Sequence, residues 1–136
     1  MILLSGCSVA VPDPAPDPTT APVCAALMAD LPTTVLDQSR RKVKPGVLSA
    51  AWGKPPIVLR CGVPKPAALT AASECLEVNG VGWFREAASG GDLFTTIGRP
   101  VFIELAVPTA YAPEPNALVD VAATVAAHDP VQTPCA

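Results

Sequence analysis

The sequence predicts one small α+β domain, with an antiparallel, possibly mixed, sheet of four to five strands in a meander, packed by a C-terminal helix and a short N-terminal helix. Three observations predict this fold class. A chain of 136 residues suits one domain and is too short for two ordinary ones. Short segments of alternating apolar residues follow one another from residue 56 to residue 107, separated by Gly, Asn and Pro. Residues 115–128 then repeat apolar side chains at helical spacing.

The chain begins with a pattern typical of bacterial lipoproteins. Leu4-Ser5-Gly6-Cys7 fits the lipobox, in which one aliphatic and two small residues precede the cysteine that receives the lipid. A complete signal peptide has a basic region and an apolar stretch of about 7–15 residues. Only Met1 to Leu3 precede the box, so we expect residues 1–7 to be a truncated signal remnant with the start codon placed too late. The alternative is a cytosolic protein with a chance Leu-Ser-Gly-Cys.

Residues 8–23 are rich in proline, with Pro12, Pro14, Pro16, Pro18 and Pro22 at close intervals. Proline fixes φ and removes the backbone donor, which disfavours both helices and strand ladders. We therefore expect a disordered, semi-extended tether that reaches about 50 Å from the membrane. The single domain would then occupy residues 24–136.

Within that domain the elements are predicted in order. A short helix covers Val23 to Leu31 and stops at Pro32, and residues 33–54 are expected to be irregular or weakly extended. Strands follow at 56–61, around the Asn79-Gly80 turn within 76–84, at 93–97 and at 101–107. The main helix, 115–128, places Leu118, Val121, Ala122 and Val125 on one stripe.

Five cysteines are present, at positions 7, 24, 61, 75 and 135. If Cys7 carries lipid, four remain, an even number in an oxidising compartment. Three pairings are possible, and we favour Cys61–Cys75 with Cys24–Cys135, which closes one short loop and ties the domain's start to its end. The alternative is four free buried thiols in a cytosolic protein.

The charges are segregated along the chain. Residues 40–65 contain seven Lys and Arg and no acid, although the net charge is −3. Clustered in space, they would make a basic patch on an acidic body; the alternative is a solvated strand edge guarded by cations.

Trp83 and Phe84 are adjacent in a predicted strand, so their rings should point to opposite faces and one of them should lie off the main core. We expect Trp52, Arg60 and Arg99, in glycine- or proline-flanked positions, to line a shallow site with it; the alternative is that the helix or the proline-rich segments cover this second face. The candidate binding surface therefore comprises Arg40, Arg41, Lys42, Lys44, Trp52, Arg60, Trp83 and Arg99.

Several function classes find little support in the composition. The acidic net charge argues against nucleic acid as a partner. One histidine and no Cys-x-x-Cys spacing give no zinc-site pattern, and no cofactor motif is present. His128 at a helix end is better explained by interaction with the helix dipole than by catalysis. The carboxylates of the predicted strands fall on solvated faces, so we predict no catalytic, cofactor-binding or metal-binding residues.

Several strings together resemble a known family. They are AWGKPPIVLRCG (51–62), EVNGVGWF (77–84), FTTIGR (94–99) and VPTAYAP (107–113). The chain is similar over about residues 24–128 to an actinobacterial envelope-protein family catalogued as domain of unknown function 3515. The resemblance implies a secreted or lipid-anchored protein, and it implies no activity.

Two function classes follow from these expectations. The first is an extracytoplasmic protein held on the outer face of the cell membrane through lipid on Cys7, acting as a non-catalytic binding or accessory module. Its partner would be an envelope protein or an anionic envelope polymer. The second is a cell-wall-directed enzyme of unfamiliar type, which requires a deep pocket with two convergent ionisable groups.

Overall fold

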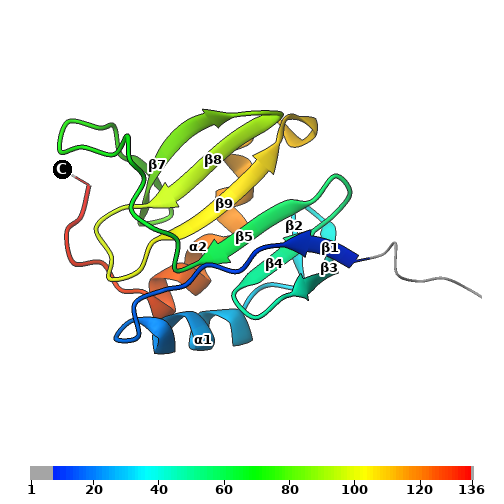
Figure 1. Ribbon diagram of the computed structural model, residues 1–136. Helices are drawn as coiled ribbons and strands as arrows, with labels where there is room; N and C mark the ends of the chain where they lie inside the picture. Colours follow the sequence, from blue (N-terminus) through cyan, green and yellow to red (C-terminus); the bar gives the residue numbers. More distant parts are fainter. Residues whose placement is uncertain (1–7, 136) are drawn as a thin grey trace, which may run out of the picture.

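The computed structural model describes residues 8–135, and it has two α-helices and nine strands there (Figure 1). In chain order the elements are β1 (Ser8–Val11), α1 (Ala21–Ala29), β2 (Thr34–Val35), β3 (Gln38–Pro45), β4 (Ser49–Trp52), β5 (Ile57–Cys61), β6 (Leu76–Val78), β7 (Val81–Ala88), β8 (Gly91–Thr96), β9 (Ile103–Pro108), the 3-10 turn η2 (Thr109–Tyr111) and α2 (Asn116–His128). The predicted α+β class is confirmed. The sheet is larger than the four to five strands expected.

The sheet consists of two meanders that meet between β5 and β9. The strand order is β1-β3-β4-β5-β9-β8-β7-β6, with β2 paired to β3 off this path. Only the β1–β3 pair is parallel among the described strands, so the sheet is mixed. In the turn between β6 and β7, Asn79 and Gly80 have φ values of 49° and 83°. Both positive values are those required by the type I′ hairpin that the Asn-Gly pair predicts.

The expectation of irregular structure over residues 33–54 is wrong. This segment contains β2, β3 and β4, and it forms the half of the sheet beside β5. All four residues of β4, from Ser49 to Trp52, are buried, so no alternation of polar and apolar residues marks the strand. In β3 exposed and partly buried residues alternate from Arg40 to Lys44, but the exposed positions hold Arg and Lys, so no run of apolar residues marks the strand. Tertiary pairing, and not local apolar patterning, makes these residues strands.

The core lies between the sheet and the two helices. In Figure 1, α2 runs behind β9 and β5, and α1 lies beside it at the bottom of the molecule. The predicted α2 stripe of Leu118, Val121, Ala122 and Val125 is buried. It packs in one cluster with the inward-facing residues of the central strands, namely Ile57, Leu59, Cys61, Ile103, Leu105 and Val107.

The polar side of α2 holds neighbouring elements in place. The Asp120 carboxylate accepts a hydrogen bond from the Leu36 amide at 2.8 Å. The Thr124 hydroxyl donates to the Asp30 carbonyl at 3.2 Å, and His128 Nε2 lies 2.8 Å from Asp30 Oδ2. Asp30 caps the end of α1. His128 therefore joins the two helices, which is a structural role.

Residues 8–23 lie along the domain and do not form the disordered tether expected. β1 pairs with β3 over Ser8 to Val11, ahead of the first proline. The Asp13 carboxylate then accepts hydrogen bonds from the Val47 and Leu48 amides and from the Ser49 hydroxyl, at 3.1, 3.1 and 2.8 Å. Proline prevents helices and ladders over these residues, but it does not prevent an extended segment from docking through side chains and carbonyls.

The disulfide pairing that we favoured is also wrong. The structure has Cys24–Cys61 and Cys75–Cys135, with Cα–Cα separations of 5.6 and 5.8 Å. Cys61 ends β5 and Cys75 immediately precedes β6, and in the sheet order β9, β8 and β7 lie between those strands. Four strand spacings of about 4.8 Å separate β5 from β6. That distance far exceeds the Cα–Cα limit of about 7 Å for a disulfide.

Candidate surface on strand β3

Strand β3 presents three cations on one face. Arg40, Lys42 and Lys44 alternate along the strand and are all exposed, so their side chains project to the same side of the sheet. Successive members are about 7 Å apart along the strand. None of the three has an ion-pair partner among residues 8–135. We call these three residues the basic face.

The two arginines of β3 also contribute to the structure. The guanidinium of Arg40 lies 5.5 Å from the centre of the Trp52 ring, in the geometry of a cation–π contact. Arg41 points to the other side of the strand, and its Nη1 donates to the Gly53 carbonyl at 3.1 Å. Lys42 and Lys44 are therefore the members of the predicted set whose charge can be changed with the least effect on packing.

Strand β3 lies between β1 and β4, and both neighbours influence the basic face. On one side Ser8 pairs with Lys42 and Ala10 with Lys44. β1 has the sequence Ser-Val-Ala-Val and adds no charge. On the other side Trp52 pairs with Arg40, so the turn that follows places exposed Lys54 near the Arg40 end. An exposed acid, Asp37, directly precedes β3 at the same end.

Three members of the predicted binding surface are buried, and the structure removes them from it. Trp52 and Trp83 have no exposed surface, and Arg99 is 7% exposed. The Trp52 indole donates to the Pro32 carbonyl at 3.0 Å. Arg99 donates to the carbonyls of Asp129 and Gly80 at 2.6 and 3.1 Å. Their glycine- and proline-rich flanks reflect close packing, not exposure.

Arg60 lies on the side of the sheet turned away from the helices. Its guanidinium pairs with Glu104 on β9 at 3.2 Å, and its Nε donates to the Pro12 carbonyl at 3.2 Å. Arg60 and Glu104 are direct cross-strand neighbours. This arginine therefore fixes the N-terminal segment to the sheet and is not part of the basic face.

A buried polar cluster at the end of α2 contains the chain's most perturbed carboxyl. Burial raises the pKa of Asp129 to about 6, against the lowering effects of the Val101 amide and the charge of Arg99. Asp129 Oδ1 accepts from the Val101 amide at 3.2 Å, while Oδ2 has no hydrogen-bond partner within the described chain. These contacts tie the end of α2 to the start of β9. The cluster opens into none of the hollows described next.

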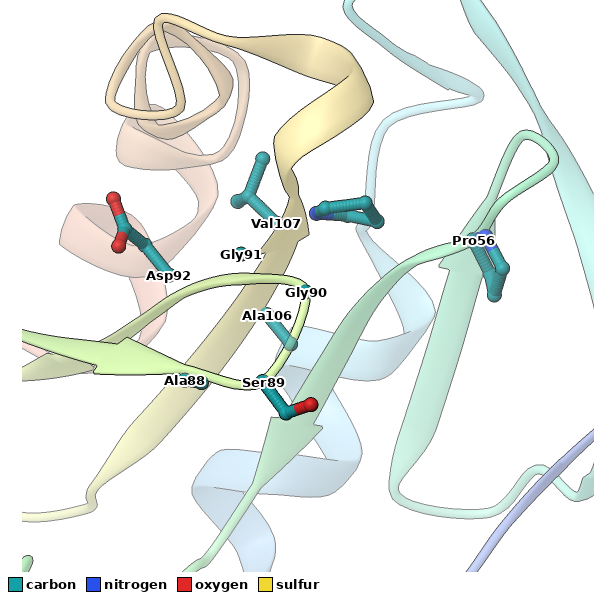
Figure 2. Close-up of a pocket in the computed structure, with 9 residues that line it drawn as sticks. Pro56, Ala88, Ser89, Gly90, Gly91, Asp92, Ala106 and Val107 are labelled. Atoms are coloured by element: carbon teal, nitrogen blue, oxygen red, sulfur yellow. The ribbon is translucent and has the colours of Figure 1, made fainter.

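A first hollow, of about 110 Å³, lies where the β7–β8 hairpin approaches Pro56 and the end of β9 (Figure 2). Its lining is mostly glycine, alanine and proline. Figure 2 shows the side chains of Ser89 and Asp92 directed apart. The Asp92 carboxylate is paired with Arg85. No convergent pair of ionisable groups is present in this hollow.

Two larger hollows lie on either side of the 73–74 segment, and the larger of them is lined by the Cys75–Cys135 disulfide. One, of about 370 Å³, is lined by Ser73, Glu74, Leu76, Trp83, Phe84 and Arg85. The other, of about 520 Å³, lies between the 69–75 segment and the 133–135 segment. Ser73 and Glu74 line both. Phe84 is half-buried here, whereas its neighbour Trp83 is inside the core, so the two rings point to opposite faces as predicted.

Comparison with known proteins gives a family assignment. The family model described as "Protein of unknown function (DUF3515)" matches residues 7–133. This chain belongs to the DUF3515 family. No curated protein and no solved structure matches it.

Two properties of this DUF3515 chain concern its location. The two disulfides indicate an extracytoplasmic domain, because such bonds persist in oxidising compartments. Among residues 8–135, neither helix is long and apolar enough to cross a membrane. Cys7, the predicted lipidation site, lies outside the described residues.

Proposed function

We propose that this DUF3515 protein is an extracytoplasmic, lipid-anchored binding module of the cell envelope. The lipid would be carried by Cys7, and the domain would bind an anionic partner without catalysing a reaction. The observation that carries the proposal is the basic face: three exposed cations in a row on one strand of a chain whose net charge is −3. An extended row of like charges suits a partner with repeated negative charges, because each contact adds to the same electrostatic attraction.

The position of the basic face supports this proposal further. Three arginines outside β3 are engaged locally: Arg60 pairs with Glu104, Arg85 with Asp92, and Arg99 is buried. The exposed members of β3 have no acid of their own strand to neutralise them. A strand in the sheet also fixes the backbone spacing of these side chains, so binding orders the side chains but needs no ordering of the backbone.

The alternative of a cell-wall-directed enzyme has less support. It requires at least two convergent ionisable groups with perturbed pKa values in a cleft. The carboxyl with the raised pKa, Asp129, is buried against Val101 and Arg99 and lines none of the three hollows. Asp17, whose pKa is lowered by the amide and hydroxyl of Thr19, lies on the exposed N-terminal segment. These two groups do not share a site.

The binding proposal is tested by reversing the charge of the two lysines. Lys42→Glu with Lys44→Glu should weaken retention on an immobilised polyphosphate or heparin column by more than about tenfold in affinity, because charge contacts with a polyanion act together. The wild-type retention should fall steeply with added salt. Arg40 and Arg41 are left unchanged because they contact Trp52 and Gly53.

A matched control has the same net charge with the basic face intact. Ala25→Glu, Ala26→Glu and Lys65→Glu are three exposed positions on α1 and in the loop after β5, and together they shift the net charge by the same amount. This variant should keep most of the wild-type retention. Equal loss in the two variants, with both still folded by circular dichroism, would show that net charge and not the basic face governs binding.

The anchor is tested separately in cells that make the protein from its full gene. The mature chain should begin at Cys7 with a mass increase equal to the attached lipid, and Cys7→Ser should release the protein from the membrane fraction. A native chain that keeps Met1, or a Cys7→Ser variant that stays with the membrane, would remove the anchor from the proposal.

A further inference from the structure

The basic face lies beside the start of β1, which directly follows the predicted lipid anchor at Cys7. Ser8, the residue that follows Cys7, is already in strand β1 and pairs with Lys42 of β3. Consecutive Cα atoms are about 3.8 Å apart, and paired strands are about 4.8 Å apart. Ser8, which is bonded directly to Cys7, therefore lies about one strand spacing from Lys42.

This arrangement leaves no room for a long spacer between the domain and an anchor at Cys7. The proline-rich residues that we expected to hold the domain away from the membrane instead follow β1 and are fixed to the sheet. Asp13 accepts from the Val47 and Leu48 amides, and the Pro12 carbonyl accepts from Arg60. A lipid on Cys7 would bring β1 and β3 to the bilayer surface itself.

We propose that the basic face of this DUF3515 domain binds the anionic headgroups of the membrane to which Cys7 is attached. The inference rests on the proposed anchor and names the partner of the proposed binding surface. Arg40, Lys42 and exposed Lys54 lie toward the end of β3 nearest Cys7, with Asp37 as the neighbouring acid. The lipid would hold the chain at the surface, and the cations would set its orientation.

Attraction of these cations to anionic headgroups affects the orientation of the domain on the membrane more than the strength of its attachment. Each Lys or Arg near an anionic leaflet strengthens association about fivefold, and the effect decays within a Debye length of about 8 Å at physiological salt. Lys42 pairs with Ser8, the residue bonded to Cys7, so lipid on that cysteine would bring this charge to within about that distance of the headgroups. A domain on a 50 Å tether would feel almost none of this attraction. Attachment through β1 would therefore select the pose in which β3 faces the bilayer.

The test uses the full chain tethered through its own cysteine. Cys7 is the one cysteine of the chain outside the two disulfides, so its thiol can be coupled to a maleimide-headgroup lipid in vesicles. Vesicles contain either phosphatidylglycerol and phosphatidylcholine in equal parts or phosphatidylcholine alone. A water-soluble acylating reagent then modifies lysines at rates followed by mass spectrometry. Exposed Lys65, in the loop after β5, is the internal reference.

On phosphatidylglycerol vesicles we expect Lys42 and Lys44 to react at least about fivefold more slowly, relative to Lys65, than on phosphatidylcholine vesicles. Salt at about 1 M, where the Debye length is about 3 Å, should abolish this protection. The phosphatidylcholine arm controls for the steric effect of the tether. Equal relative rates on both kinds of vesicle would overturn the inference.

The same experiment separates failure of this inference from failure of the proposed function. Equal rates on vesicles, together with polyphosphate retention that Lys42→Glu and Lys44→Glu abolish, would mean that the basic face binds a soluble polyanion and not the membrane. Equal rates together with retention unaffected by those substitutions would overturn both proposals. Coupling through maleimide does not depend on natural lipidation, so a native chain without lipid would remove the anchor alone.

Discussion

Asp129 shows how one residue can make the stability of the chain depend on pH. Its side chain is wholly buried where α2 ends, and Oδ2 has no hydrogen-bond partner among the described residues. Burial without full pairing disfavours the charged carboxylate, so the pKa rises from 3.8 to about 6. The folded chain therefore holds this proton more tightly than the unfolded chain does. The stabilisation from protonation is complete below pH 3.8 and is lost as the pH rises through about 6.

We expect Asp129→Asn to flatten the pH dependence of stability between about pH 4 and pH 6. The amide stays neutral and its oxygen still accepts from the Val101 amide. Over this range the free energy of unfolding of the wild type should fall by about 2 kcal/mol relative to the variant. Urea unfolding at a series of pH values measures the difference. Glu77→Gln, at an exposed position of β6, is the control, and parallel curves for wild type and Asp129→Asn would contradict the burial argument.

Among the helices and strands, those marked by a pattern within their own residues could be predicted from the sequence. The α2 stripe needs only the helical period, and the hairpin at Asn79-Gly80 needs only two residues that accept positive φ. Strands β5 and β9 were found because apolar residues alternate along them. In each case the information lies within about a dozen residues.

The elements that were missed depend on distant partners. β4 pairs with β3 and β5 along its two edges, while its faces are covered by the core, which holds Ala50 and Trp52, and by the Asp13 segment, which bonds to Ser49. β1 has four residues and forms only because β3 accepts it as a parallel neighbour. Prolines that follow β1 suggested disorder for the whole segment. Nothing local in the sequence indicates that Asp13 would find the Val47 and Leu48 amides.

The residues predicted for the candidate surface also fall into two groups: those placed by a local pattern and those placed by distant elements. Alternation along 40–44 was enough to place Arg40, Lys42 and Lys44 on one face once β3 was known to be a strand. The tryptophans were misplaced because their burial is made by other elements: Arg40 lies over Trp52, and Trp83 is part of the core cluster that includes the buried stripe of α2. On the opposite face of β7, the Cys75–Cys135 disulfide packs on Gly82. A Cβ at Gly82 would lie 2.6 Å from both sulfur atoms. Only glycine leaves room for the disulfide at this position. The sequence shows the glycine but not the disulfide that requires it.

For the whole molecule, the position of β9 decides the topology and the disulfides together. β9 returns from the second meander to lie beside β5, so the two ends of the 62–75 loop are carried to distant strands. Cys61 is left next to α1, and Cys75 next to the C-terminal segment. Cysteine spacing favours short loops in an unfolded chain, but strand order determines which sulfur atoms meet in the folded one.

Removal of either disulfide should loosen the part of the domain that it holds. Cys75→Ala with Cys135→Ala opens a bridge that spans 60 positions of the chain, and chain entropy gives a loss of up to about 4 kcal/mol in the free energy of unfolding. The loosening should be local: amide exchange should accelerate at Gln132 and Thr133, which bond to the Gly98 carbonyl, and not in α1. Cys24→Ala with Cys61→Ala is the matched control and should loosen α1 instead. Cleavage of the unreduced wild type after Arg60, Glu74 and Arg85 separates Cys24, Cys61, Cys75 and Cys135 onto different peptides. Linked peptides joining Cys24 to Cys135 would contradict the sheet order, because that order decides which sulfur atoms meet. Four free thiols would contradict the extracytoplasmic location, because that conclusion needs the bonds to exist.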